Sequence, residues 1–415
     1  MWSAFALVHL VVIGLALFGP GYPLGDVEVV YRGWAENVLA GRIPGITEDF
    51  VYPLLALVPI VSAAYFGAPV YLATWFVLVT ATNAMAFAVL TRSHRGAAWW
   101  WLAFLGLLGP IALTRIDAIT VPIVIVAVLW LRRHPLISTA LLTVATWIKI
   151  WPVAALAALF VASRWRWRIL AVAAAVSAAI VAGAVALSLG SGNATHVLSF
   201  VAEQAGRGIQ IEAPVATPWL WQAALGVPGS DIYYDRQILT FQVDGPGVLT
   251  TGALMTPLLG LVAVGVLLLG LRAQRRGAGW FTVLPPLFVA LTVTLIAVNK
   301  VGSPQFISWL AAPMILGLVS YGRRSRIPTL LALALAGLTQ VIYPYCYDWL
   351  LVANPILVFI LTLRNALEFV LLGWALWVVF ALGAPPKRDA AMGLATTTRL
   401  PPAPSNTIRR EPPCS

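Results

Sequence analysis

The sequence predicts an all-α integral membrane protein, a polytopic bundle of about twelve transmembrane helices. Of its 415 residues, 60% are hydrophobic and only 10% are charged, which is far from the composition of soluble domains. Apolar runs such as residues 169–189 are long enough to cross a bilayer, which needs about 20 such residues. Five short breaks between apolar runs hold thirteen of the 26 Lys and Arg residues and no Asp or Glu.

The basic breaks fix the expected topology, because short loops rich in Lys and Arg face the cytoplasm. Both termini are then expected inside, with twelve crossings near residues 1–20, 69–91, 97–113, 118–131, 136–149, 152–162, 167–189, 250–272, 279–297, 304–320, 327–342 and 356–382. Residues 53–66 would lie at the outer interface or form a partial span. The net charge of +11 follows from this topology, so we expect a protein of the plasma membrane that binds no nucleic acid.

We expect one transmembrane domain over residues 1–384, with external loops at 21–68 and 190–249 that carry interfacial helices. Residues 385–415 are rich in Pro, Thr and Arg and are expected to form a disordered cytoplasmic tail. Twelve of the fifteen acidic residues fall on the external side of this map. Because acidic residues have little influence on topology, their concentration on one side indicates a functional external face.

The first external loop begins with "GDVEVVYRGWAENVLAG", residues 25–41. Its apolar residues recur at spacings of three and four, which predicts an amphipathic helix lying on the outer membrane surface with its apolar side down. Asp26 stands at the start of this helix. It is either a helix N-cap, a common role for Asp, or a carboxylate with a chemical function.

Two further breaks on the external side carry charge. Arg115 and Asp117 lie in the tight hairpin "ALTRIDAITVP", where they either neutralise each other or serve a function, since ionisable residues at membrane depth are often functional. Lys149 lies in "TWIKIWP", between two tryptophans. Its side chain either extends to the interface as a snorkelling lysine or binds a lipid phosphate.

The remaining candidate residues come from three later segments. The long loop 190–249 contains "EQAGRGIQIEAPVATPW", which holds Arg207, Gln210 and Glu212, and its aromatic residues indicate that it is ordered. The other candidates are Lys300 and Gln305 in "NKVGSPQFISW" and Tyr343 in "QVIYPYCYDW". Arg364 and Glu368 lie four residues apart within the last span, where we expect an intramembrane ion pair.

The external residues suggest one kind of chemistry. Motifs of soluble nucleotide-binding and metal enzymes are absent from the sequence, so we expect no cofactor and no metal. Cations beside a membrane-depth groove suit an anionic lipid such as a polyprenyl phosphate-linked sugar, and aromatic side chains suit sugar rings. A carboxylate can accept the proton of an acceptor hydroxyl.

These motifs occur in an order that resembles the polyprenol-phosphate-mannose-dependent mannosyltransferases of glycosyltransferase family 87, which have the GT-C fold. That group includes actinobacterial enzymes that add α-1,2-linked mannose to phosphatidylinositol mannosides. The resemblance runs from about residue 20 to 380. It depends on the collinear segments "GDVEVVYRGW", "FVYPLL", "TRIDAITVP", "IKIWPVAAL", "RGIQIEA", "KVGSPQFISWL" and "YPYCYDWL…LRN".

The resemblance implies roles for individual residues. Asp26 matches the acidic residue of the first external loop, the base of GT-C enzymes. The hairpin of Arg115 and Asp117 resembles the second external loop, which approaches the donor phosphate or a metal. Lys149 occupies the Lys-x-x-Pro position of the family. Leu54 departs from the family pattern, in which a second proline often follows "YP".

We therefore expect an inverting transfer of one hexose, with mannose as the expected sugar, to a lipid-linked or extracytoplasmic glycan acceptor. Asp26 is the expected base. Arg115, Lys149, Lys300 and Arg207 are expected to bind the donor phosphate, and the expected substrate-binding residues are Asp117, Gln210, Glu212, Gln305 and Tyr343. If Asp26 is only a cap, the base is to be sought at Asp117, Glu212 or His196. The alternatives are a lipid or glycan transporter and a non-catalytic subunit of an envelope-building complex.

Overall fold

Helices make up nearly all of the regular structure in the computed structural model, which describes residues 1–191 and 196–382. The α-helices of these residues are α1 (Trp2–Phe18), α2 (Arg32–Leu39), α3 (Leu57–Ala63), α4 (Tyr71–Ser93), α5 (Arg95–Leu108), α6 (Asp117–Trp130), α7 (Pro135–Ile148), α8 (Val153–Ala162), α9 (Arg166–Ser191), α10 (Ser199–Ala205), α11 (Thr217–Ala224), α12 (Val248–Arg275), α13 (Trp280–Ala297), α14 (Ala311–Tyr321), α15 (Arg326–Gln340), α16 (Tyr347–Leu351) and α17 (Pro355–Leu382). Strands β1 (Asp231–Asp235) and β2 (Thr240–Asp244) form an antiparallel hairpin. The expected tail, 385–415, lies outside the described residues.

The predicted positions of the helices are confirmed, because each of the twelve expected crossings contains an α-helix. The number of crossings is not confirmed. Among the described residues six helical stretches are long and apolar enough to span a membrane: Ala68–Ser93, Arg166–Leu189, Val248–Arg275, Trp280–Ala297, Pro304–Tyr345 and Pro355–Leu382. The stretch Pro304–Tyr345 covers two of the expected crossings, and several other helices are shorter apolar segments of 10–17 residues.

The main core of the bundle surrounds α13. Almost every side chain from Val283 to Thr294 is buried, and α13 packs against α8, α12, α14 and α17. By contrast, α9 leaves most of its apolar side chains exposed. A helix with apolar side chains on an exposed surface suits contact with lipid. These helices therefore form a membrane-embedded scaffold with a closely packed interior.

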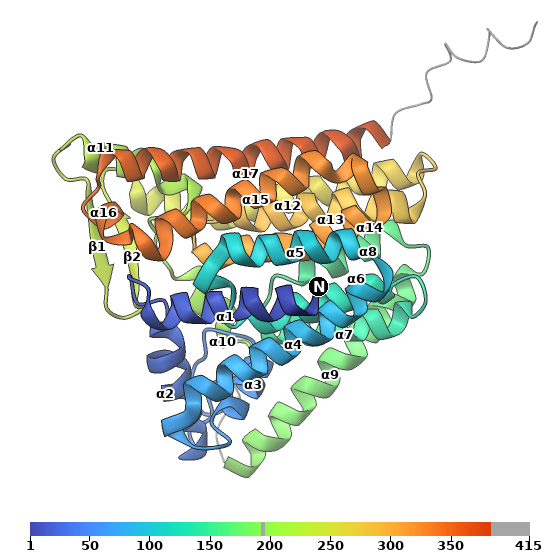
Figure 1. The fold of residues 1–415 in the computed structure, drawn as a ribbon, viewed down its shortest axis with the longest axis horizontal. Coiled ribbons are helices and arrows are strands. Elements are labelled where there is room, and N and C mark those ends of the chain that lie inside the picture. The colour runs from blue at the N-terminus through green and yellow to red at the C-terminus, as the bar shows by residue number, and fades with distance from the viewer. Residues whose placement is uncertain (192–195, 383–415) are drawn as a thin grey trace, which may run out of the picture. The chain divides into compact units, whose positions relative to one another are not determined.

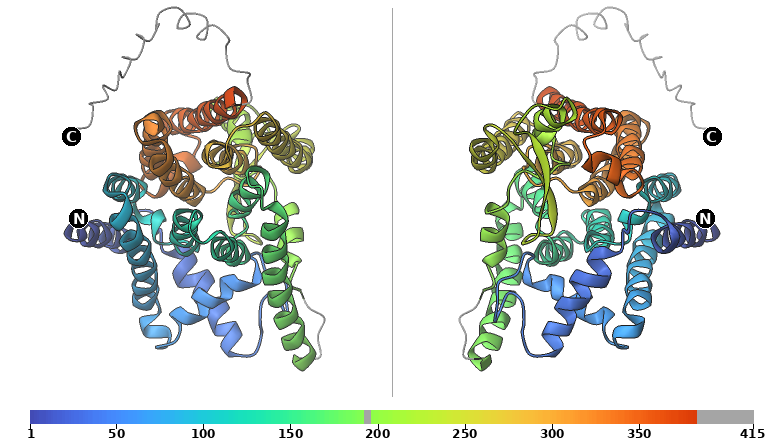
Figure 2. Two further views of the ribbon diagram at one scale, coloured as in Figure 1. Left: turned by 90° about the vertical axis from the view of Figure 1, so that its right-hand side faces the viewer. Right: turned by 90° about the vertical axis from the view of Figure 1, so that its left-hand side faces the viewer.

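The non-membrane elements gather at one end of the bundle. Figure 1 shows α2, α11, α16 and the hairpin together at the same end, where α15 ends and α17 begins. The right-hand view of Figure 2 looks onto this end, with the hairpin facing the viewer. The loop expected at 190–249 contributes α10, α11 and both strands, so the prediction that it is ordered is confirmed for its described residues.

The helix predicted over residues 25–41 is present as a π-helical turn, Asp26–Tyr31, that continues into α2. Its apolar side does not face a membrane. Val27 and Tyr31 are fully buried in the protein, within a cluster that includes Ile60 and Trp75. The expected orientation on the membrane surface is therefore wrong for this face, because α3 and α4 supply the apolar partner instead.

Candidate functional site

A cavity of about 350 Å³ opens at the end of the bundle where the loops gather. Its walls come from the helix of the first loop, the segment 203–212, the tip of the hairpin, the loop 302–305 and the region of Tyr343. Seven of the ten predicted site residues line it: Asp26, Arg115, Arg207, Gln210, Glu212, Gln305 and Tyr343. Segments that are more than three hundred residues apart in the sequence, such as those of Asp26 and Tyr347, thus meet around one space.

Asp26 lines this cavity and forms an ion pair with Arg115. Oδ2 of Asp26 lies 3.0 Å from Nε of Arg115, and the carboxylate side chain is 35% exposed. The residue at the N-cap position is Gly25, and the helix has no side-chain cap hydrogen bond. The interpretation of Asp26 as a helix cap is therefore wrong. Its carboxylate is available to the cavity, with one oxygen held by a guanidinium.

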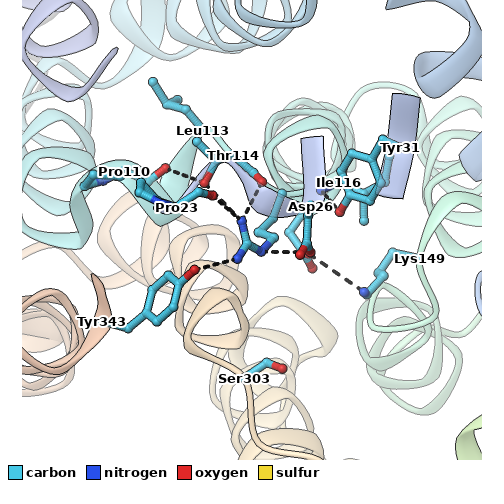
Figure 3. A network of polar contacts seen from close by, with 12 residues as sticks. Pro23, Asp26, Tyr31, Pro110, Leu113, Thr114, Ile116, Lys149, Ser303 and Tyr343 are labelled. Carbon is cyan, nitrogen blue, oxygen red and sulfur yellow. Dashed lines mark hydrogen bonds and ion pairs between the residues drawn. The ribbon is translucent and has the colours of Figure 1, made fainter. Parts of the chain in front are cut away.

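Arg115 is almost completely engaged by its surroundings. Its Nη1 donates to the carbonyl oxygens of Pro23 at 2.7 Å and Thr114 at 2.9 Å, and its Nη2 donates to the hydroxyl of Tyr343 at 3.0 Å. Figure 3 shows these partners converging with Asp26 on one point. Burial alone would lower the pKa of Arg115, but Asp26 and Tyr343 raise it above its ordinary value. The guanidinium thus stays charged and holds Asp26 in place.

Asp117 belongs to a separate network. Its Oδ1 accepts a hydrogen bond from Nε1 of Trp309 at 2.6 Å, and its Oδ2 lies 3.9 Å from Nζ of Lys149. Nζ of Lys149 also lies 4.1 Å from the ring centroid of Tyr52. Neutralisation of Arg115 by Asp117 is therefore wrong, because each has a different partner.

Lys149 and Lys300 do not line the cavity, and neither does Asp117. The Lys149 side chain is only 11% exposed, so its interpretation as a snorkelling lysine is wrong. Lys300 lies at the neighbouring loop, where its backbone oxygen accepts a hydrogen bond from the backbone N–H of Gln210 at 3.0 Å. Burial lowers the pKa of the Lys300 ammonium.

Arg207 and Gln210 present nitrogen atoms whose hydrogen-bonding capacity is not used. Nε of Arg207 and Nε2 of Gln210 are buried without a hydrogen-bond partner among the described residues. Both residues line the cavity. Buried N–H groups are normally paired, so these two donors are suited to a ligand rich in oxygen.

Glu212 is the second carboxyl group of the cavity and is only 2% exposed. The side chain of Arg364 lies between it and Glu368, with Nη1 3.9 Å from Oε2 of Glu212 and Nε 3.7 Å from Oε1 of Glu368. The predicted ion pair of Arg364 and Glu368 is thus confirmed and extended to a third member. Burial raises the pKa of Glu212 to about 7, although Arg364 opposes the shift.

The backbone near Glu212 is held by a close approach of two loops. Gly302 lies so near this segment that a Cβ at this position would clash with the backbone of Glu212 and Ala213. Arg364 adds a hydrogen bond from Nη2 to the carbonyl oxygen of Glu212 at 2.6 Å. Glycine at 302 therefore allows the loop 302–305 and the Glu212 segment to share one wall.

Aromatic side chains form much of the remaining surface. Trp34 and Tyr52 meet edge to face with ring centroids 5.6 Å apart, and Tyr343 and Tyr347 meet similarly at 5.0 Å. All four line the cavity. Flat aromatic surfaces with polar groups between them suit a ring that is apolar on its faces and hydroxylated at its edge.

The hairpin tip was not predicted as part of the site. Residues 237–241, at the turn between β1 and β2, line the cavity. The alternation in "TFQVD" and the β-branched and aromatic residues of "DIYYD" are signals for two short strands, whereas the prediction for this loop is only that it is ordered. Among the described residues, no group of three or more His, Cys, Asp or Glu side chains is placed to hold a metal ion.

Residues 50–230 match the model of glycosyltransferase family 87. This segment includes Tyr52, Arg115, Arg207 and Glu212 of the cavity, whereas Asp26 precedes it. No curated protein and no solved structure matches the chain. Over residues 50–230 the resemblance to glycosyltransferase family 87 is thus confirmed, and this match indicates a glycosyltransferase activity.

Proposed function

We propose that this glycosyltransferase moves one hexose, with mannose as the expected sugar, from a polyprenyl-phosphate donor to a lipid-linked or extracytoplasmic glycan acceptor. The observation that carries the proposal is the single cavity that Asp26, Arg207 and aromatic walls share. A carboxylate, a cation and flat apolar surfaces are the groups needed for an acceptor hydroxyl, a phosphate and a sugar ring.

In the proposed reaction the acceptor oxygen attacks the anomeric carbon of the donor in a single displacement. The new C–O bond forms as the bond between that carbon and the phosphate oxygen breaks, and polyprenyl phosphate leaves. Asp26 accepts the proton of the acceptor hydroxyl as general base. A β-linked donor then gives an α-linked product with inversion, as the family resemblance implies.

Arg115 acts in this proposal as a positioning residue for Asp26. Its guanidinium nitrogens already contact Asp26, Pro23, Thr114 and Tyr343. A base held in a fixed orientation loses less freedom when the acceptor binds. Among the four cations expected at the phosphate, we therefore assign the direct contact to Arg207, which lines the cavity and whose buried Nε has no hydrogen-bond partner among the described residues.

Lys149 and Lys300 contribute to the site from behind its walls in this proposal. Lys149 supports Tyr52 and compensates Asp117, and Lys300 supports the backbone of Gln210. Gln210, Gln305 and Tyr343 line the cavity beside Arg207 and are proposed to contact the substrates. Asp117 is proposed to act indirectly, through Trp309 and Lys149.

The proposed location is the plasma membrane, with the cavity on the extracytoplasmic side. The basic breaks support this orientation, because they lie between helices at the positions expected for cytoplasmic loops. A transporter would need polar groups along a path through the membrane. The buried charges of α17, Arg364 and Glu368, instead pair with each other, which favours an enzyme over a transporter.

The test is sugar transfer by the purified protein in lipid nanodiscs. We expect label to move from polyprenyl-phosphate-[³H]mannose to a lipid extract of acceptors and the product to carry an α-linkage. Polyprenyl-phosphate-glucose and a nucleotide-linked mannose serve as comparison donors. Transfer from the nucleotide donor, or no transfer from any polyprenyl-phosphate hexose, would overturn the proposal.

A further inference from the structure

The carboxyl group of Glu212 has an oxygen to which no described residue donates a hydrogen bond. Oε2 is buried and has no hydrogen-bond partner in residues 1–191 and 196–382. Glu212 also lines the cavity. A buried oxygen without a donor is destabilising, and groups of this kind in a native structure often mark a functional site.

Arg364 is the nearest cation, but its N–H groups are directed elsewhere. Nη2 donates to the backbone oxygen of Glu212 at 2.6 Å and to Oδ1 of Asn365 at 2.8 Å, and Nε donates to the same Asn365 oxygen at 3.1 Å. The Nη1 to Oε2 distance of 3.9 Å is too long for a hydrogen bond. Arg364 thus balances charge near Glu212 without forming a hydrogen bond to Oε2.

The charge balance of this cluster also favours a neutral or hydroxylated ligand. One guanidinium faces two buried carboxyl groups, Glu212 and Glu368. Arg115 also influences Glu212, but its charge is already paired with Asp26. A phosphate placed against Glu212 would add negative charge to a cluster that already has an excess of acidic groups. A hydroxyl adds none, and it can donate a hydrogen bond to Oε2.

We propose that Oε2 of Glu212 accepts a hydrogen bond from a ring hydroxyl of the transferred hexose and thereby selects the donor sugar. This inference rests on the proposed function and gives Glu212 a role in the same cavity. Arg207 is proposed to bind the phosphate and Asp26 the acceptor hydroxyl, and Glu212 lines the same cavity as both. A site built to bind a hydroxyl rejects an analogue that lacks it.

The test measures donor binding and therefore needs no acceptor. Polyprenyl-phosphate-mannose is first bound to the wild-type protein in nanodiscs, and its 2-, 3-, 4- and 6-deoxy analogues then compete with it. We expect one deoxy donor to bind about tenfold to a hundredfold more weakly than the parent, the effect of losing a hydrogen bond to a charged group. The other analogues should bind nearly as well as the parent.

Two matched variants locate the effect. Glu212→Met and Glu368→Met each remove one carboxyl group and leave Arg364 with one acidic partner, but only Glu212 lines the cavity. We expect Glu212→Met to bind the parent donor about tenfold to a hundredfold more weakly. This variant should also bind the parent and the discriminated deoxy analogue equally well. Glu368→Met should keep that preference.

The outcomes separate this inference from the proposed function. If the wild-type protein does not bind polyprenyl-phosphate-mannose or any other polyprenyl-phosphate hexose, the proposed function fails. If it binds the parent but no deoxy analogue is discriminated, the role of Glu212 is overturned, even if Glu212→Met does not fold. The role of Glu212 is also overturned if Glu212→Met still binds the deoxy analogue more weakly than the parent. It is likewise overturned if Glu368→Met loses this discrimination to the same extent as Glu212→Met.

Discussion

Replacing Asp26 by Asn removes the proposed proton acceptor while the shape of the side chain changes little. Asn can still accept a hydrogen bond from Nε of Arg115, but it cannot take a proton from an acceptor hydroxyl. We expect turnover to fall by about 10²–10⁴-fold, the usual contribution of general acid–base catalysis. Donor binding should change by less than about threefold, because the phosphate contact is assigned to Arg207.

The structure also gives the expected effect of this change on stability. Asp26 is partly exposed, whereas Arg115 is buried. The loss should lie between that of a surface ion pair, about 0–1 kcal/mol, and that of a broken buried pair, about 3–5 kcal/mol. Because Arg115 keeps its bonds to Pro23, Thr114 and Tyr343, we expect a decrease of about 1–2 kcal/mol in the free energy of unfolding.

The assay compares three preparations in nanodiscs: the wild-type protein, Asp26→Asn and the matched control Asp49→Asn. Asp49 also contacts a basic residue, with its Oδ1 2.7 Å from Nδ1 of His196. Its side chain, however, is 61% exposed and does not line the cavity. Transfer rate, donor affinity and thermal unfolding are measured for each. If Asp26→Asn transfers sugar at a near wild-type rate, or if both variants lose activity equally, the assignment of the base is refuted.

Three further predictions follow from other parts of the structure. Arg207→Gln should weaken binding of the polyprenyl-phosphate donor about tenfold to a hundredfold. The control Arg42→Gln, at an exposed position hydrogen-bonded to Asn37, should leave donor binding unchanged, and equal donor affinities of the two variants would contradict a phosphate contact by Arg207. Burial raises the pKa of Glu212 from 4.5 to about 7, so between these pH values the folded state holds a proton that the unfolded state releases. The free energy of unfolding should therefore fall as pH rises from about 4.5 to 7. Thermal scans should show a smaller fall for Glu212→Met, and an identical pH profile would contradict the assignment of this fall to Glu212. In a Cys346→Ser background, cysteines at positions 133 and 275 should be protected from an impermeant thiol reagent in intact cells and a cysteine at 231 should react; labelling at 275 would overturn the orientation.

The positions of the membrane helices could be predicted because each depends on local composition. A run of apolar residues between basic breaks identifies a helix without knowledge of its neighbours. The number of crossings could not be predicted in the same way. Helices such as α8, with ten residues, are too short to span a bilayer alone, and only their packing shows that they belong to the interior.

The membership of the site was predictable to a large extent, but its pairings were not. Charged and amide residues are rare in this sequence, so their presence between the apolar runs made Asp26, Arg207 and Glu212 candidates for the site. The sequence also placed Arg115 and Asp117 two residues apart. Residues at this spacing point in different directions at the start of a helix, so Arg115 reaches back to Asp26 and Asp117 reaches Lys149.

The hairpin was missed for a different reason. Each strand has only five residues, so its sequence pattern is weak within a loop of about sixty residues. The hairpin owes its position to neighbours distant in sequence: the loop at Gln210 bridges to Gln242, and α11 packs against both strands. Such contacts can be seen only after the chain has folded.

The two arginines that line the cavity differ in whether their N–H groups already have hydrogen-bond partners, and this difference indicates which of them can bind a ligand. Charge and location alone would make Arg115 and Arg207 equivalent phosphate ligands. Arg115, however, has partners on all three of its nitrogens, so a phosphate could bind it only by displacing Asp26 or a hydrogen bond that holds the loop. Arg207 keeps a buried Nε without a partner in the described part of the chain, and a phosphate oxygen would satisfy it at no loss. The same reasoning distinguishes the carboxyl groups. Asp26 is held by Arg115 and is partly exposed, as the proposed proton transfer requires. Glu212 is buried, and its Oε2 has no hydrogen-bond partner among the described residues, as the proposed recognition of a hydroxyl requires. We therefore base the proposed places of the donor phosphate and the sugar ring on these atoms without a partner more than on the charges.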